Sequence, residues 1–396
     1  MEAAHFPLTR ADALKRLDDF VAGAAESYGA RRNHVDAAGV HAGVSRLSAA
    51  LRRRLISEEE VVRAVLAVHP YATVETYIAE VFWRTYWKGW LERHRELWPQ
   101  VQDEILTART RLETDAPTAA RYRAAIGGAT GIHAFDHWAD ELSRTGYLHN
   151  WARMQVASIW IFTLGLPWQL GADWMFAHLV DADPASNTLS WRWVAGLHTA
   201  GKAYLADAAR IANMTDGALT ANRLATRAVI PSAGTPPDLS ELRDPLHPDG
   251  KAPSLILLTC EDLSLETQLD LEDVRGIVTV RDLALSDADH TALADAARRA
   301  AQRWPGVPCK EAGRGELAAI ARDLGCAQIV TGFAPAGPVA DGLRDIRKPL
   351  ADQGIAFAEH LRRWDRLAWP FCAKGFFQLK SRIPALLQEQ GIVATS

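Results

Sequence analysis

Polar side chains and tryptophans are concentrated between Thr145 and Trp193, and this segment constrains the fold more than any other. It contains a His-Asn pair, an arginine, two aspartates, an amide and two tryptophans: His149, Asn150, Arg153, Asp181, Asp183, Asn187, Trp191 and Trp193. A folded core tolerates such polar side chains only when they have partners. The segment therefore predicts a built polar cluster, and with it a candidate ligand site.

Tryptophan is unusually abundant in the same half of the chain. Of the 14 tryptophans, 11 lie between Trp83 and Trp193. Most of these rings can be explained as a bulky aromatic core. The functional interpretation is that some of them stack on a planar ligand or relay electrons.

Bulk composition sets limits on the class of protein. A length of 396 residues favours two domains, and 48% hydrophobic with 23% charged residues is typical of a globular chain. The net charge of −4 gives no general basic field, so DNA binding needs a local basic patch. The four cysteines show no C-x-x-C spacing, and no apolar run reaches the length of a membrane span. We expect reduced thiols, no metal site, no membrane segment and a cytoplasmic location.

Apolar residues recur at three- and four-residue spacing from residue 11 to about residue 213, which predicts an almost continuous series of helices. The expected helices include 13–24, 58–68, 73–97, 119–126, 135–145, 147–162 and 201–211. The pattern changes after Ile230, where Pro-, Gly- and Asp-rich stretches predict an exposed linker.

Strand and helix signals alternate beyond the linker, which predicts a Rossmann-like, doubly wound α/β domain. The expected strands are 254–259, 276–280, 327–331 and 355–358, and the expected helices are 289–303, 314–324 and 338–353. The predicted organisation is a helical domain over 1–228, a linker over 229–251 and an α/β domain over 252–396. The loop 332–337 follows a strand, where α/β ligand loops lie, but it lacks a dinucleotide fingerprint and an ordinary loop is favoured.

Five separated motifs occur in one order along the helical part. They are Tyr28 with Arg32-Asn33 and 43–48, then 77–86, 128–154, Trp168 and 181–193. Together they resemble the FAD-binding core of the DNA photolyase/cryptochrome family. The resemblance implies an all-α FAD-binding domain, and it identifies the α/β part as antenna-like, with a second chromophore left open.

The resemblance also implies which residues bind FAD. They are Tyr28, Ser45, Leu47, Ser48, Tyr77, Glu80, Arg84, Asn150, Arg153, Asp181, Asp183 and Asn187. Ser45 and Ser48 stand where a helix begins, which suits a pyrophosphate, although a plain serine N-cap explains the same pattern. Arg153 is expected to pair with an acid near the isoalloxazine ring, and Asn187 to face flavin N5.

A second implied set lines a substrate cavity and acts in catalysis: Glu80, Trp83, Asn150, Met154 and Trp193. Glu80, Trp83 and Arg84 share one helical face by their spacing, although an exposed Glu–Arg pair is the plainer interpretation. Trp191 and Trp193 are two residues apart, so on a helix they face opposite sides. By resemblance, Trp191 and Trp168 are the first members of an electron relay, whose third member is not identified; the candidates are Trp98, Trp160 and Trp174.

Four departures separate this chain from the family pattern. Arg54 stands where a glycine is usual, a short insertion separates Asn33 from Gly43, Trp151 replaces a basic residue after His-Asn, and 201–213 replaces the usual aromatic run. These changes affect expected DNA contacts more than flavin contacts. The α/β part follows the helical part instead of preceding it, which either a circular permutation or an unrelated fusion explains.

Three functions are compatible with these residues. The first is a light-driven carbon–carbon lyase in which reduced FAD donates an electron to a pyrimidine dimer in single- or double-stranded damaged DNA. The second is a cryptochrome-like photoreceptor with a protein partner, which the acidic net charge and Trp151 favour. The third is a flavoprotein without DNA repair.

Overall fold

The computed structural model describes residues 6–36, 39–199, 201–232 and 237–392. The chain forms two compact units, and both are discontinuous in sequence. Unit 1 comprises Ala24–Arg46 and His94–Leu239, and unit 2 comprises Phe6–Gly23, Leu47–Arg93 and the chain from Ser240 onward. The compact units follow contacts rather than sequence order, and the predicted boundaries around a linker at 229–251 stay a prediction.

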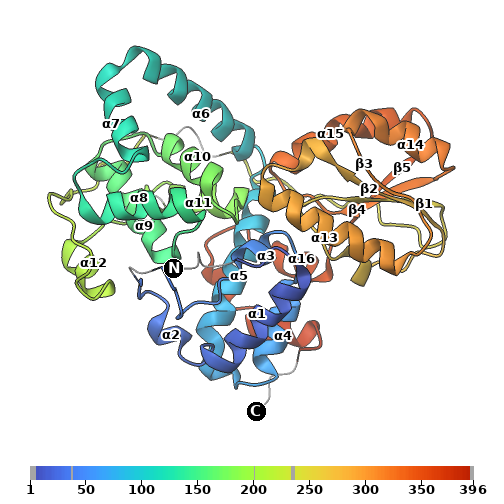
Figure 1. The fold of residues 1–396 in the computed structure, drawn as a ribbon, viewed down its shortest axis with the longest axis horizontal. Helices are drawn as coiled ribbons and strands as arrows, with labels where there is room; N and C mark the ends of the chain where they lie inside the picture. Colours follow the sequence, from blue (N-terminus) through green and yellow to red (C-terminus); the bar gives the residue numbers. More distant parts are fainter. Residues whose placement is uncertain (1–5, 37–38, 200, 233–236, 393–396) are drawn as a thin grey trace. The chain divides into compact units, whose positions relative to one another are not determined.

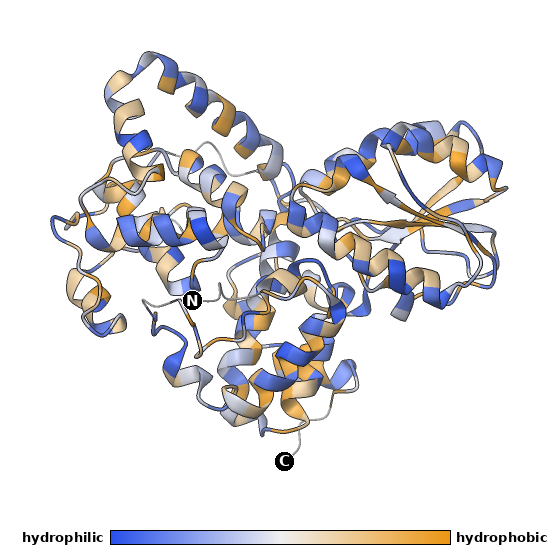
Figure 2. Ribbon diagram, in the orientation of Figure 1, coloured by the Kyte–Doolittle hydropathy of each residue, from blue (hydrophilic) through white to orange (hydrophobic). Residues whose placement is uncertain are grey.

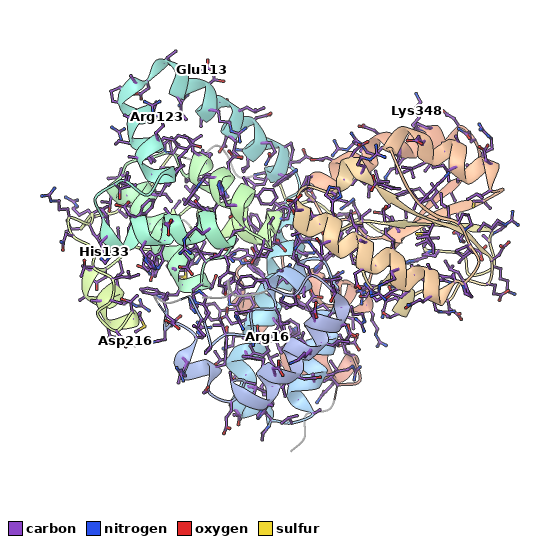
Figure 3. All side chains as sticks on the ribbon, in the orientation of Figure 1. Arg16, Glu113, Arg123, His133, Asp216 and Lys348 are labelled. Atoms are coloured by element: carbon purple, nitrogen blue, oxygen red, sulfur yellow. The ribbon has the colours of Figure 1, made fainter. Side chains whose placement is uncertain are left out.

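Unit 1 is helical (Figure 1). Its elements are α2 (Tyr28–Arg31), α6 (Leu97–Thr114), α7 (Ala116–Ile126), α8 (His133–Thr145), α9 (Asn150–Ser158), the π-helix η1 (Ile159–Thr163), α10 (Trp168–His178), α11 (Pro184–Val194) and α12 (Ala208–Met214). Solvated side chains such as Glu113 on α6 and Arg123 on α7 extend outward (Figure 3). In the described part of the chain, no helix has both the length and the apolar character needed to cross a membrane.

Two expected helices of unit 1 have different bounds in the structure. The helix expected over 147–162 begins at Asn150, because the His149 side chain accepts a hydrogen bond from the Trp151 N–H and caps it, and it then widens into η1. The expectation of a helix over 201–211 was wrong for its first part: helix α12 begins at Ala208, where the Asp207 carboxylate accepts from the Arg210 N–H at 2.7 Å. Residue 200 lies outside the described residues.

The helices of unit 2 come from both ends of the chain. They are α1 (Arg10–Gly23), α3 (Ser48–Arg52), α4 (Glu58–Leu66), α5 (Tyr71–Arg93), α13 (Asp287–Arg303), α14 (Leu317–Asp323), α15 (Pro338–Ala351), α16 (Arg363–Ala368), α17 (Phe377–Lys380) and α18 (Ile383–Glu389), with the 3-10 turns η2 (Leu265–Thr267), η3 (Arg281–Leu283), η4 (Arg314–Glu316) and η5 (Trp369–Phe371). Local sequence sets their starts. At α4, the Ser57 hydroxyl accepts from the Glu60 N–H and the Glu60 carboxylate accepts from the Ser57 N–H, which forms a capping box.

A five-stranded parallel sheet forms the centre of the α/β part of unit 2. Its strands are β1 (Ser254–Leu258), β2 (Val274–Val280), β3 (Cys309–Ala312), β4 (Gln328–Gly332) and β5 (Ala356–His360), in the order β3-β2-β1-β4-β5. Four of them were expected; β3 was missed because its residues Cys-Lys-Glu-Ala are mostly exposed and carry no apolar run. The predicted architecture, a helical part together with a parallel α/β sheet formed by the later part of the chain, is confirmed.

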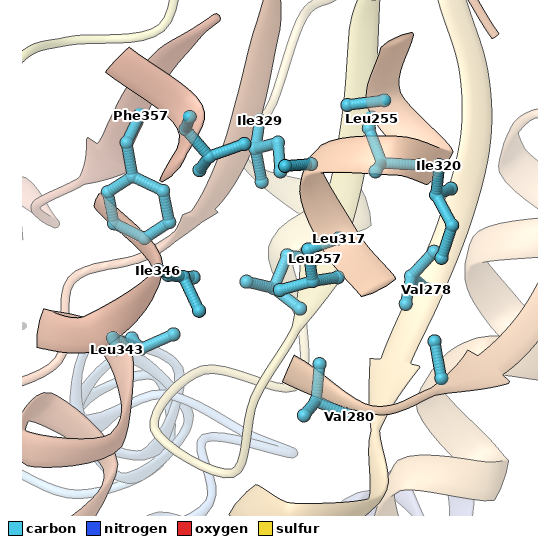
Figure 4. Close-up of a cluster of buried hydrophobic side chains, with 14 of the residues drawn as sticks. Leu255, Leu257, Val278, Val280, Leu317, Ile320, Ile329, Leu343, Ile346 and Phe357 are labelled. Atoms are coloured by element: carbon cyan, nitrogen blue, oxygen red, sulfur yellow. The ribbon is translucent and has the colours of Figure 1, made fainter. Parts of the chain in front are cut away.

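Helices cover both faces of this sheet. Leu257 and Val278 on one face pack against Leu317 of α14 and Leu343 of α15 (Figure 4). Helix α13 covers the opposite face (Figure 1). Helices α13 and α15 alternate hydrophobic and hydrophilic stripes, as expected for helices with one buried side (Figure 2). The strand β1 is buried throughout, as central strands of parallel sheets are.

Three consecutive arginines bind α3 to the loop that follows β1. Arg52 pairs with Glu261 at 2.9 Å and also donates to the carbonyl of Cys260 at 2.9 Å. Arg53 pairs with Asp289 at 2.8 Å, and its carbonyl accepts from the Leu263 N–H. All three guanidinium groups are buried, so their ion pairs are shielded from water and from salt.

The third arginine, Arg54, stands at the position where the family pattern has a glycine. Its φ is +49°, in the left-handed region that glycine adopts most easily. The arginine nevertheless gains buried partners: Asp365 of α16 at 2.6 Å and Glu58 of α4 at 3.3 Å. The backbone strain at this position is therefore offset by charge pairing that a glycine could not make.

We predict that Arg54→Met lowers the free energy of unfolding by about 3–5 kcal/mol, because Glu58 and Asp365 then remain buried with less compensation. Urea denaturation at neutral pH measures the change. The matched control is Lys15→Met, which removes the exposed Lys15–Asp19 pair and should cost no more than about 0.5 kcal/mol. Equal losses in the two variants would show that the buried arginine is not a major source of stability.

Candidate functional site

The residues implied by the family resemblance fall into two sets, one in each unit. The larger set lies in unit 1: Tyr28, Ser45, Asn150, Arg153, Met154, Trp168, Asp181, Asp183, Asn187, Trp191 and Trp193. The smaller set lies in unit 2: Leu47, Ser48, Tyr77, Glu80, Trp83 and Arg84. Each set is described within its own unit.

A bidentate ion pair between Arg153 and Asp181 belongs to the unit 1 set. The Arg153 guanidinium donates to both carboxylate oxygens of Asp181, at 3.2 and 2.9 Å, and its Nε donates to the Leu148 carbonyl at 2.9 Å. Asp181 is 5% exposed, so the charge needs this partner. The pair holds a carboxylate and a guanidinium in fixed orientation beside α9.

Helix α9 presents a polar face and a buried face. Asn150 is exposed, and Arg153 and Met154 are half-buried, at i, i+3 and i+4. Trp151 lies on the other side, 2% exposed, with its ring at a right angle to that of Trp138 and 6.3 Å from it. The residue that replaces the family's basic side chain is therefore part of the core in this protein.

Helix α11 positions the acid, amide and tryptophans of the last motif. The Asp183 carboxylate caps the helix by accepting from the Ser186 N–H at 2.8 Å, and the Asn187 amide donates to the Ala172 carbonyl at 2.8 Å. Trp191 is buried, whereas Trp193 is half-buried and lies 5.7 Å from the ring of Tyr204. The two tryptophans thus have different surroundings, as their two-residue spacing predicts.

A buried histidine cluster in unit 1 was not anticipated. His41, which lies in the inserted segment after Asn33, bonds Glu141 through Nε2 at 2.8 Å. Its ring is 5.2 Å from that of Tyr147 and 5.7 Å from that of His149. The insertion was visible in the sequence, but its partner Glu141 is a hundred positions away and no local pattern links them.

His149 is held neutral in this cluster. Burial, together with the neighbouring His41 and Arg153, lowers the pKa of His149 to about 3. Its Nδ1 accepts from the Trp151 N–H at 3.2 Å, so the proton is on Nε2. Among the described residues, Nε2 makes no hydrogen bond. Burial likewise raises the pKa of Tyr147 to about 12, which keeps that phenol protonated.

In unit 2, the predicted phosphate-side residues stand at the start of α3. Ser48 is the first residue of the helix and Leu47 is its N-cap, so neither serine of the motif acts as a side-chain cap there. The Ser48 hydroxyl is buried and makes no hydrogen bond within the described ranges. A buried hydroxyl of this kind fits an oxygen-rich ligand better than it fits an apolar core.

The α5 residues of the set differ in burial: Tyr77 is buried, whereas Glu80 and Arg84 are half-buried. Tyr77 is 4% exposed, with its ring 4.7 Å from that of Phe20 on α1. Glu80 and Arg84 are half-buried, and the Arg84 Nε lies 4.0 Å from the Glu58 carboxylate. The Glu80–Arg84 face is therefore not the fully exposed pair that spacing alone would allow.

Trp83 is stacked on one side. Its ring lies parallel to that of Phe376, with centroids 3.9 Å apart and 15° between the planes. Phe376 precedes α17, in the C-terminal segment of unit 2. One face of the Trp83 ring is thus covered by the protein itself.

Side chains from elsewhere in unit 2 contact the loop 332–337 of the α/β part. Arg243 lies 4.5 Å over the ring of Phe333 and donates to the Ala334 carbonyl at 2.8 Å, and the Glu92 carboxylate accepts from the Ala336 N–H at 3.1 Å. A side chain at Gly332 would collide with Asp262. This arrangement agrees with the plainer expectation of an ordinary loop.

A comparison with known families matches the FAD binding domain of DNA photolyase over residues 77–221. The deoxyribodipyrimidine photo-lyase of Escherichia coli is 29% identical over 207 residues, which cover 51% of this chain and 42% of that protein. A cryptochrome DASH of Gloeobacter violaceus is 40% identical over 70 residues, which cover 18% of this chain and 14% of that protein.

Among solved structures, a bacterial class III photolyase from Agrobacterium tumefaciens is 27% identical, with a TM-score of 0.42 over 52% of this chain and 42% of that chain. The matched region is therefore less than half the length of the photo-lyases that it resembles.

We predict that the neutral His149 makes unit 1 sensitive to acid. An unfolded histidine has a pKa near 6.5 and takes up a proton that the folded site refuses down to about pH 3. The stabilising effect is therefore complete above pH 6.5 and is lost as the pH falls, by up to about 1.4 kcal/mol per pH unit. Urea unfolding at pH 7 and pH 5, followed in the wild type and in His149→Gln, measures it.

The loss of stability between these pH values should be smaller in His149→Gln by about 2 kcal/mol. His133→Gln, which changes an exposed histidine of the same unit, is the control and should follow the wild type. An unchanged pH dependence in His149→Gln would mean that this imidazole accepts a proton in the folded state.

Proposed function

Because the helical part of the chain belongs to the DNA photolyase/cryptochrome family, we propose that the protein binds FAD and uses blue light to split pyrimidine dimers in DNA. The observation that carries the proposal is the matched region 77–221, which contains every residue of the implied substrate set. That set is Glu80, Trp83, Asn150, Met154 and Trp193. The activity is that of a carbon–carbon lyase driven by electron transfer.

The side chains of both units fit a flavin cofactor. The fixed Arg153–Asp181 pair and the Asn187 amide supply charge and hydrogen bonding for a polar ring edge. In unit 2, the buried Ser48 hydroxyl suits a phosphate oxygen. Within unit 1, we propose FAD-binding roles for Arg153, Asp181 and Asn187 and also for Tyr28, Ser45, Asn150 and Asp183. Within unit 2, we propose them for Ser48 and also for Leu47, Tyr77, Glu80 and Arg84. Bound FAD would supply light absorption and one-electron chemistry.

The substrate role rests on aromatic stacking and one carboxylate. A flipped dimer presents flat, hydrogen-bonding bases, which tryptophan rings bind by stacking. Trp193 and Trp83 are both half-buried, so part of each ring is accessible for stacking. Glu80 accepts hydrogen bonds from the bases, and its half-buried position keeps it able to reach a ligand.

A cryptochrome-like photoreceptor is the second candidate. The match to a cryptochrome DASH favours it. The net charge of −4 and the buried Trp151 favour it as well, because DNA phosphates are bound chiefly by basic side chains at the surface. In this alternative, light still reduces the flavin, and the consequence is a contact with a protein partner. A flavoprotein without light chemistry would show neither response.

The decisive experiment is light-dependent repair by the FAD-loaded, chemically reduced protein. An oligonucleotide with one pyrimidine dimer, single- or double-stranded, is illuminated with blue light beside a dark control, and the return of base absorbance is recorded. Repair in the light alone supports the lyase. Bound flavin without repair, together with intact photoreduction, would support the photoreceptor.

We predict that Glu80→Ala lowers the repair rate by about tenfold to a hundredfold, as the loss of a hydrogen bond to a bound base should do. Most of the FAD content should be retained, because the eleven other proposed FAD-binding residues are unchanged, and the flavin spectrum of the purified variant checks this. Glu75→Ala is the matched control: it lies on the same helix, is half-exposed and pairs with Lys380 at 3.4 Å. If both variants repair at the wild-type rate, Glu80 has no part in substrate binding.

A further inference from the structure

Trp160 lies at the centre of an aromatic group in unit 1. Its ring stacks on Trp174 with centroids 5.6 Å apart and 13° between the planes, and it meets Trp191 edge-on at 6.0 Å. Trp160 belongs to the π-helix η1, an element that often marks functional positions. The indole N–H of Trp160 donates to the Pro167 carbonyl at 2.9 Å, which fixes the ring.

A glycine makes the junction of these rings possible. A Cβ built on Gly171 of α10 would collide with the Trp191 ring and would lie 2.9 Å from the Trp160 ring. Real side chains do not approach other atoms this closely, so only glycine permits both rings to approach this turn. Trp160, Trp174 and Trp191 thus form one continuous ring contact, all fully or almost fully buried.

Trp168 has a different electrostatic environment. The Arg192 guanidinium lies 5.6 Å from the centre of its ring. A cation is attracted to a neutral indole, but it repels an indole that has lost an electron. Among the described residues, no ring contact joins Trp168 to Trp191. Oxidation of Trp168 is therefore disfavoured, whereas the parallel Trp160–Trp174 pair can share a positive charge over two rings.

We propose that the electron relay of this protein runs from Trp174 through Trp160 to Trp191, and does not pass through Trp168. The proposal rests on the proposed function, since it needs bound FAD and light. Trp191 loses one electron to the light-excited flavin, Trp160 refills Trp191, and Trp174 refills Trp160. The positive charge then rests on the stacked pair, and no bond forms or breaks within the protein.

A thiol in solution completes the balance. It returns one electron to the Trp174–Trp160 pair and releases its proton to water, and two oxidised thiols join as a disulfide. Trp174 suits this end of the relay because its ring lies 5.8 Å from that of His178, which is exposed. Two electrons delivered to the flavin therefore correspond to one disulfide formed.

The test uses the FAD-bound protein, blue light and a thiol, and it records how fast the oxidised flavin spectrum is lost. Trp160→Phe and Trp174→Phe should each slow photoreduction by about tenfold or more, whereas Trp168→Phe should change it by less than about twofold. Trp138→Phe is the matched control, because this buried tryptophan packs on Trp151, and the ring contacts of the described residues do not join it to Trp160, Trp174 or Trp191.

A second measurement does not depend on the rate. Illumination in air without thiol should let dioxygen add to the tryptophan radical. The oxygen adduct should form at Trp174 or Trp160, where peptide mass mapping of the wild-type protein locates it. Oxidation mainly at Trp168, or a large rate loss in Trp168→Phe with none in Trp160→Phe, would overturn the proposal.

The two levels of failure are distinguishable. If Trp191→Phe abolishes photoreduction while Trp160→Phe and Trp174→Phe do not, the relay proposal is wrong and the light-driven function stands. If the wild-type protein binds no FAD or shows no photoreduction, the proposed function itself fails, and the relay with it. Gly171→Ala gives an independent check, since separating the Trp160 and Trp191 rings should slow photoreduction without removing either indole.

Discussion

The buried arginine run of α3 is the interaction on which unit 2 depends. Arg52, Arg53 and Arg54 pair with acids that lie more than two hundred positions later, except for the local partner Glu58. A buried ion pair contributes less through net attraction than through the cost of leaving either member alone. These pairs therefore specify which surfaces may meet: α3 must pack with the loop after β1, with α13 and with α16. The chain from Ser240 onward is thereby one compact unit with helices from its first hundred residues.

This packing has a consequence for the α/β sheet. In open parallel sheets, ligands bind beyond the carboxyl ends of the strands, where the strand order reverses. Here that position lies between β1 and β4. The loop after β1 is bonded to the α3 arginines, and Asp262 within it takes two hydrogen bonds from Arg362. The loop after β4 is held by Arg243. Side chains of the protein itself therefore hold both loops at the position between β1 and β4.

Patterns local in sequence predicted most of the fold. Helical periodicity and the alternating strand pattern located most of the expected helices and four of the five strands, although the helix expected over 201–211 begins only at Ala208. The motif order identified the flavin-type core. Two kinds of feature could not be predicted: an exposed edge strand and contacts between residues that are far apart in the sequence. The exposed strand β3 has no apolar run because it is an edge strand with little to bury. The pairing of His41 with Glu141 and that of Arg54 with Asp365 join residues whose proximity only the folded chain creates. At Arg54 the sequence showed the missing glycine but not its compensating partners.

The predicted site shows the same limit in its tryptophans. Sequence could place Trp191 and Trp193 on opposite sides of a helix, because that follows from a turn of 3.6 residues. It could not rank Trp98, Trp160 and Trp174, because ring contact depends on the π-helix η1 and on the absence of a side chain at Gly171. Nor could the sequence reveal that Trp168 lies beside Arg192, because the two residues belong to different helices and meet only in the folded chain. A charge 5.6 Å from an indole decides whether that ring is a good electron donor or a poor one. Motif resemblance points to a kind of chemistry, whereas the proposed electron path follows from the neighbours that each ring has in the folded chain.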